Sequence, residues 1–168
     1  MKKRTKKYRP KFVATNPLTQ FFGGMSGDHA DHLQTLLARN HGAMAAIVQG
    51  RGTRDAWDLL VGAVNMGNVM CEQGIGDEFR ASMIAGRDAL CEVGKRAIRT
   101  GKFVFTGDEL RTMNEAMDCH DAQLENIRAV DIDRASNEVL RRIRHGLNTT
   151  NVRAEMAKEV DQGGCVLF

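Results

Sequence analysis

The sequence predicts an all-α fold, an antiparallel bundle of four main helices plus a shorter fifth, preceded by a flexible basic N-terminal arm. Apolar residues recur at spacings of three and four along several long stretches, which is typical of helices with one buried face. Glycine-rich turns separate these stretches. Only residues 102–105 approach the alternation of a strand, and they are too few. With 168 residues, the chain is expected to form a single domain with a sizeable core.

The first two helices are delimited by turn and capping residues. The first is expected over residues 28–49 and ends at the turn of residues 50–52. Thr53 then provides the N-cap of the second helix, and Asp55 lies in its first turn, where the helix dipole favours a negative charge. The Gly-Ile-Gly sequence at residues 74–76 ends that helix.

The remaining three helices carry similar signals. The third is expected to begin near Asp77 and to end at Gly101. Thr106 and Glu109 form a capping box that begins the fourth, because each side chain accepts a hydrogen bond from the other residue's backbone N–H. The shorter fifth helix is expected over residues 131–145, with the glycine that follows as its C-cap.

Several glycines lie inside the predicted helices, where each costs about 0.8–1 kcal/mol relative to alanine. One explanation is that a neighbouring helix approaches too closely for a side chain to fit, and the other is a break in the helix. We favour close approach because most of these glycines lie near the apolar stripes. The residues concerned are Gly42, Gly62, Gly67, Gly86 and Gly94.

Basic residues divide the chain into an arm and a body. The first twelve residues contain seven cations and no acid, whereas the rest of the chain holds 17 basic and 21 acidic residues. We therefore expect a flexible basic arm at residues 1–15, a helical bundle domain at residues 16–146 and a weakly structured tail at residues 147–168.

The arm is the leading candidate for a binding site. Its cations can neutralise phosphates, and its aromatic residues can stack on exposed bases. No base-reading module is recognisable, so contact with nucleic acid would be independent of sequence. An acidic protein surface is an alternative partner, and a solvated tail without a partner is equally compatible with this composition. The candidate binding residues are Lys2, Lys3, Arg4, Lys6, Lys7, Tyr8, Arg9 and Lys11.

A second candidate site combines two histidines with polar neighbours. His41 and His120 each lie on the apolar stripe of a predicted helix. With Asn40 and Asp121 they are expected to form a buried polar network. A metal site, and with it a metal-dependent enzyme that uses the histidine pair, is a weaker alternative because the Glu-x-x-His pattern of di-iron bundles is missing. We expect no metal and no other cofactor.

Several classes of function have no signature in the sequence. P-loop, GxGxxG, GxSxG and HExxH motifs are missing in the context that each requires, which argues against the common enzyme classes. The longest apolar run, Ala43–Val48, is far too short to cross a membrane, and no signal peptide is recognisable. Four cysteines without a CxxC pair are typical of reduced thiols, so a cytoplasmic protein is expected.

Short motifs resemble those of small helical proteins encoded by proteobacterial phages and prophages. They lie at residues 6–11 (KKYRPK), 40–41 (NH), 76–80 (GDEFR) and 120–124 (HDAQL). The resemblance implies a bacterial host cytosol, a mobile genetic element and a partner in replication, packaging or host defence.

These observations favour a non-enzymatic binding protein. Its helical body would make a protein–protein contact, with a second copy of the chain as one possible partner, and its arm would contact nucleic acid. The alternative hypothesis is an inhibitor or adaptor that binds a bacterial host protein involved in defence or replication.

Overall fold

The computed structural model describes residues 29–125 and 127–145, and this part of the chain is all-helical, as predicted. The basic arm, the glycine after the fifth helix and the C-terminal tail lie outside the described residues. None of the described helices combines the length and the apolarity that crossing a membrane requires. The elements are α2 (His29–Val48), α3 (Arg54–Glu72), the 3₁₀ helix η1 (Asp77–Phe79), α4 (Arg80–Thr100), α5 (Gly107–Glu125) and α6 (Ala129–Arg144).

Most of the predicted helix ends are confirmed. The Thr53 hydroxyl accepts a hydrogen bond from the Ala56 backbone N–H at 3.2 Å. In the capping box, the Thr106 N–H donates to the Glu109 carboxylate at 2.7 Å and the Glu109 N–H donates to the Thr106 hydroxyl at 3.3 Å. Gly101 ends α4 in the left-handed conformation, with φ 69°.

The start of α4 differs from the prediction. The α-helix begins at Arg80 rather than near Asp77, because the first turn is the 3₁₀ helix η1. Gly76 is left-handed, with φ 65°, and the Phe79 N–H donates to the Gly76 carbonyl at 3.0 Å, a bond across three residues. The chain therefore turns tightly out of α3 before the longer helix starts.

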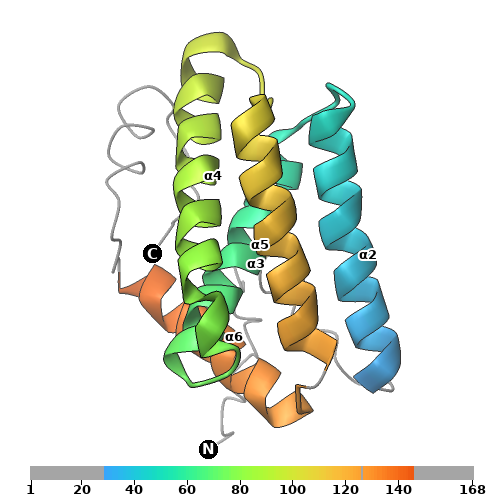
Figure 1. Cartoon of the computed structure of the whole chain (residues 1–168), viewed down its shortest axis with the longest axis vertical. Coiled ribbons are helices and arrows are strands. Elements are labelled where there is room, and N and C mark those ends of the chain that lie inside the picture. Colours follow the sequence, from blue (N-terminus) through green and yellow to red (C-terminus); the bar gives the residue numbers. More distant parts are fainter. Residues whose placement is uncertain (1–28, 126, 146–168) are drawn as a thin grey trace, which may run out of the picture.

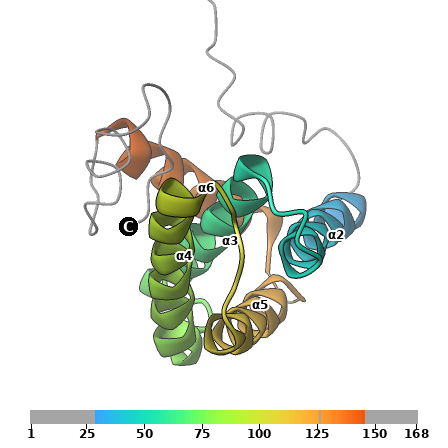
Figure 2. The same cartoon turned by 90° about the horizontal axis from the view of Figure 1, so that it is seen from above.

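Helix α3 lies at the centre of the structure, because it packs against α2, α4, α5 and α6 (Figure 2). Helix α4 also packs along α5. Helix α6 runs across the other helices rather than along them (Figure 1). Because α3 contacts both α2 and α5, the seam between these two helices is close to the central helix on its inner side.

The apolar core consists of two main clusters that share α3. One lies between α2, α3, α4 and α5 and includes Trp57, whose indole N–H donates to the Leu90 carbonyl at 3.0 Å. The other joins the C-terminal half of α3 to α5 and α6. Its largest buried members are Met66, Met70, Leu124, Ile127 and Ile132.

Three of the helix-interior glycines, Gly42, Gly67 and Gly86, divide into two kinds. A Cβ atom on Gly86 would lie 2.7 Å from the Ala116 Cβ of α5, and one on Gly67 would collide with the Met83 sulfur of α4. Close approach is therefore confirmed at these two positions. Gly42 has nothing within 4 Å of its Cβ position, so close approach does not explain it.

Candidate functional site

Two dipeptides face each other across the seam between α2 and α5. Asn40-His41 lies on α2 and His120-Asp121 lies on α5, and the His41 Nε2 is 2.6 Å from the Asp121 Oδ2. The side chains of His41 and Asp121 are 52% and 26% exposed, so this bond lies at the surface. Asn40 and His120 lie beneath it, with 0% and 1% exposure. We call these four residues the seam quartet.

His41 is not directed inward, in contrast to the expectation from its apolar stripe. Consecutive residues of an α-helix point about 100° apart, so Asn40 and His41 cannot both face the core. Asn40 takes the inward direction and His41 the outer edge, where it meets Asp121. On α5 the order is the same, because His120 is buried and Asp121 is partly exposed.

Gln123 determines the orientation and the tautomer of the buried imidazole. Its Nε2 donates to the backbone carbonyls of Gly67 and Ile75, at 3.2 and 2.9 Å. Because a carbonyl only accepts hydrogen bonds, the amide oxygen of Gln123 must point the other way, to the His120 Nδ1 at 3.4 Å. We therefore assign the proton of neutral His120 to Nδ1, which leaves Nε2 as a hydrogen-bond acceptor.

Burial keeps His120 neutral. Desolvation lowers the pKa of His120 below its ordinary value of 6.5, and the charge of His41 acts in the same direction. The hydrogen bond to Gln123 and the charge of Asp121 raise the pKa, but the net effect is a lower value. At neutral pH the imidazole is therefore uncharged.

Several buried polar atoms in this region have no hydrogen-bonding partner among the described residues. They are the Asn40 Nδ2 and Oδ1, the Asn68 Nδ2, the His120 Nε2 and the Asp121 Oδ1. All but the Asn68 atom belong to the seam quartet. Each unsatisfied buried group costs about 1–3 kcal/mol, and such groups are rare in native proteins. The seam quartet is therefore the least satisfied part of the described interior.

The described residues contain no group of three or more His, Cys, Asp or Glu side chains placed to hold a metal ion. Within the seam quartet, the structure brings His41 and Asp121 into contact as a pair.

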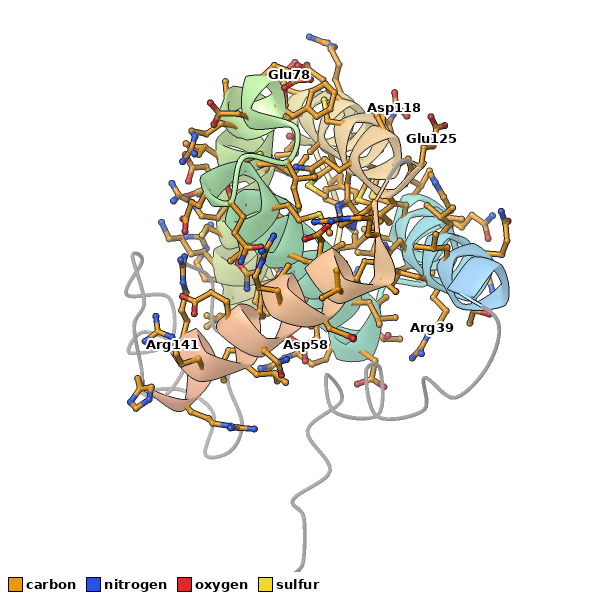
Figure 3. All side chains as sticks on the ribbon, turned by 90° about the horizontal axis from the view of Figure 1, so that it is seen from below. Arg39, Asp58, Glu78, Asp118, Glu125 and Arg141 are labelled. Atoms are coloured by element: carbon orange, nitrogen blue, oxygen red, sulfur yellow. The ribbon has the colours of Figure 1, made fainter. Side chains whose placement is uncertain are left out.

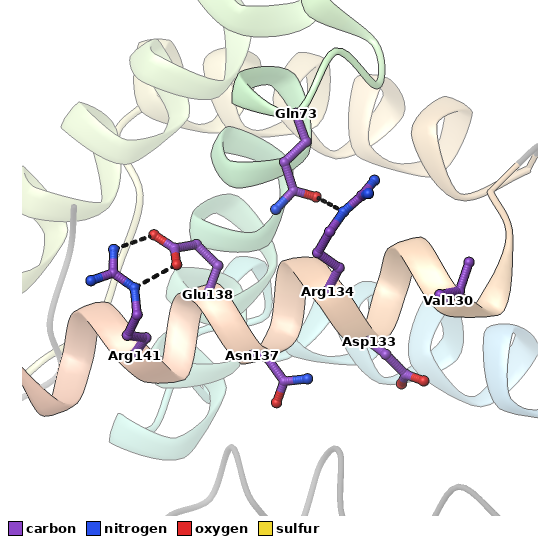
Figure 4. Close-up of a pocket in the computed structure, with 7 residues that line it drawn as sticks. All are labelled: Gln73, Val130, Asp133, Arg134, Asn137, Glu138 and Arg141. Carbon is purple, nitrogen blue, oxygen red and sulfur yellow. Dashed lines mark hydrogen bonds and ion pairs between the residues drawn. The ribbon is translucent and has the colours of Figure 1, made fainter.

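A second candidate site is an open groove on α6 that sequence reasoning missed (Figure 4). Its volume is about 520 Å³, and its lining residues are Gln73, Val130, Asp133, Arg134, Asn137, Glu138 and Arg141. Hydrogen bonds from Arg141 and Arg142 lower the pKa of Glu138 to about 2. The spacing of three and four between these residues was the only sequence signal for their pairing.

Charge is distributed unevenly over the described helices. Helix α5 carries six acidic residues and only one basic residue, Arg111. The side chains of Glu78, Asp118 and Glu125 lie on one side of the molecule, away from α6 (Figure 3). The eight candidate residues of the basic arm lie outside the described part, so the structure places none of them.

In comparisons with known proteins, no protein family, no curated protein and no solved structure matches the chain.

Proposed function

We propose that the chain is a non-enzymatic binding protein of phage or prophage type that acts in a bacterial cytosol. Its helical body, an antiparallel bundle of four main helices with a shorter fifth, makes a protein–protein contact, and its basic arm contacts nucleic acid without sequence preference. The observation that carries the proposal is the charge division, with seven cations and no acid in residues 1–12 against an excess of acids in the rest of the chain.

The cations of the arm differ from those of α6 in having no acid beside them in the sequence. On α6, Asp131 binds Arg128 and Arg134 at 2.6 and 2.7 Å, and Glu138 binds Arg141 at 2.7 Å. A guanidinium that is already paired must give up that partner before it binds a phosphate, which makes the paired arginines of α6 weaker candidates for contact with nucleic acid. The acidic surface of α5 repels phosphates, which favours contact through the arm.

Fluorescence anisotropy with labelled single-stranded DNA, duplex DNA and RNA tests this proposal on the full chain. One double variant, Lys6→Gln with Lys7→Gln, removes two charges from the arm. A matched variant, Arg99→Gln with Lys102→Gln, removes two charges from exposed positions at the end of α4. Both variants change the net charge equally, so a difference in their binding affinity reflects where the two charges lie rather than the total charge.

We expect the arm variant to weaken binding to all three nucleic acids similarly and the matched variant to leave it close to wild type. The arm variant should also reduce the dependence of log K on log salt by about 2, one for each lost phosphate contact. Equal effects of the two variants, or unchanged binding after removal of residues 1–12, would contradict the proposed role of the arm.

The open groove on α6 favours a second candidate function, that of an inhibitor or adaptor for a bacterial host protein. Val130, which is 61% exposed, lies in this groove among charged and amide side chains, a combination that suits a protein surface. A pull-down from nuclease-treated host lysate separates the two functions. A partner that is retained by wild type and lost with Val130→Asp would support the inhibitor.

A further inference from the structure

The seam quartet has the composition of a small internal binding site. The 2.6 Å contact between His41 and Asp121 fixes the two dipeptides at the same level of the α2–α5 seam. Asn40 and His120 each precede one of these residues and are turned inward beneath them. Four unpartnered buried polar atoms belong to three of these residues, Asn40, His120 and Asp121.

The donor and acceptor character of these atoms determines which ligand they can bind. The Asp121 Oδ1 and the Asn40 Oδ1 are acceptors, and the His120 Nε2 is a third acceptor because Gln123 fixes the proton on Nδ1. The Asn40 Nδ2 is the only donor group among the four atoms. A ligand bound here must therefore donate more hydrogen bonds than it accepts, which excludes an anion and any molecule that only accepts hydrogen bonds.

We propose that the seam quartet is an internal site for water, in which at least two water molecules bridge Asn40, His120 and Asp121. One water molecule donates two hydrogen bonds, so it can satisfy two of the three acceptors but not all of them. A second molecule supplies the missing donor, and the Asn40 amide group donates to one of the two. Buried water typically forms about three hydrogen bonds. Two water molecules that bind each other and share these four protein atoms would each form about that number.

The surface pair forms the lid of this site. His41 and Asp121 are bound to each other and partly exposed, while the unpartnered Oδ1 of the same carboxylate is buried. The His41–Asp121 bond is therefore the contact of the seam quartet that solvent reaches first, and the unpartnered atoms are shielded from solvent. At the other edge of the imidazole, the His120 Nδ1 faces the Gln123 amide, which in turn donates to the Gly67 carbonyl of α3.

Nuclear magnetic resonance on the full chain tests the proposal directly. We expect the carbon-bound Hε1 proton of His120 to show dipolar cross-peaks to water whose signs are opposite in NOESY and ROESY spectra. That proton does not itself exchange with solvent, and a signal relayed through exchange of the neighbouring Nδ1–H is distinguished because it grows with the exchange rate of that proton, whereas a direct signal from bound water does not. The nitrogen shifts of the imidazole should also show Nδ1 protonated and Nε2 unprotonated.

A matched pair of variants gives an independent readout. Asn40→Leu removes the buried amide at nearly constant shape, and Asn114→Leu makes the same change at an exposed position on α5. Asn40→Leu should abolish the water cross-peak at His120, because the water molecules lose the Asn40 amide that helps to hold them. It should also lower the urea midpoint relative to Asn114→Leu, because the acceptors of His120 and Asp121 are then left without water.

A wild-type protein without the cross-peak would overturn the proposal, and so would the opposite tautomer of His120. A higher urea midpoint for Asn40→Leu would overturn it as well, since a dry site gains stability when an unpartnered amide is removed. The wild-type spectrum decides the question even where Asn40→Leu fails to fold.

Discussion

Helices α4 and α5 approach so closely at Gly86 that an added methyl group should be destabilising. The Cβ of alanine at this position would lie 2.7 Å from the Ala116 Cβ, whereas carbon atoms pack best at about 3.5–4.0 Å. The two helices would have to separate by about 1 Å, and overpacking of this kind costs about 1–3 kcal/mol.

The intrinsic preference for helix acts in the opposite direction. Replacing glycine by alanine within a helix stabilises it by about 0.8–1 kcal/mol when the space is free. Gly42 meets that condition, since nothing lies within 4 Å of its Cβ position. Gly42→Ala should therefore raise the free energy of unfolding by nearly that amount, whereas Gly86→Ala should leave it unchanged or lower it by up to about 2 kcal/mol.

Urea unfolding followed by far-ultraviolet circular dichroism measures the difference between the two variants. We expect Gly42→Ala to be more stable than Gly86→Ala by about 1–3 kcal/mol with similar m values, and a chain of this size should shift its Tm by about 2–4 °C per kcal/mol. A Gly86→Ala variant that gains as much stability as Gly42→Ala would refute the close approach of α4 and α5.

Three further predictions concern polar side chains that are buried or partly buried. Because burial lowers the pKa of His120 in the folded chain, the unfolded chain takes up this proton first, so the free energy of unfolding should fall as the pH drops below the ordinary value of 6.5. The slope should reach at most about 1.4 kcal/mol per pH unit, and pH titration of His120→Gln should show this contribution missing. Trp57→Phe removes the hydrogen bond to the Leu90 carbonyl and leaves a gap, and we expect thermal unfolding to report a loss of about 2–3 kcal/mol. Glu109→Gln keeps a capping side chain but removes the charge that binds Arg96 at 2.9 Å, so urea unfolding should show a loss of about 1 kcal/mol, and full stability would indicate that the pair contributes nothing.

The elements of the fold were predictable because their signals are local. Thr53 and Thr106 each cap a helix through a partner three residues away, so the sequence contains the whole interaction. The 3₁₀ turn η1 was missed because its tight geometry depends on the left-handed Gly76, and such a glycine is compatible with several turn types.

The candidate site was only partly predictable because its partners are distant in the sequence. The pairing of His41 with Asp121 spans 80 residues, and the apolar stripe alone could not show which of Asn40 and His41 faces inward. Gln123 was missed for the same reason, since it binds the carbonyls of Gly67 and Ile75, which are 56 and 48 residues away in the sequence. Backbone carbonyls carry no sequence signature, so periodicity gives no means of finding such a contact.

The salt dependence of nucleic-acid binding tests the proposed function most directly. For the full chain we predict a linear fall of log K with log salt, with a slope that approaches about −5 on single-stranded DNA and about −6 on duplex DNA if all seven arm cations contact phosphates. A variant with these seven residues changed to glutamine should give a slope near zero. A shallow slope for the full chain, or the same slope for both proteins, would contradict the proposal that the arm binds nucleic acid.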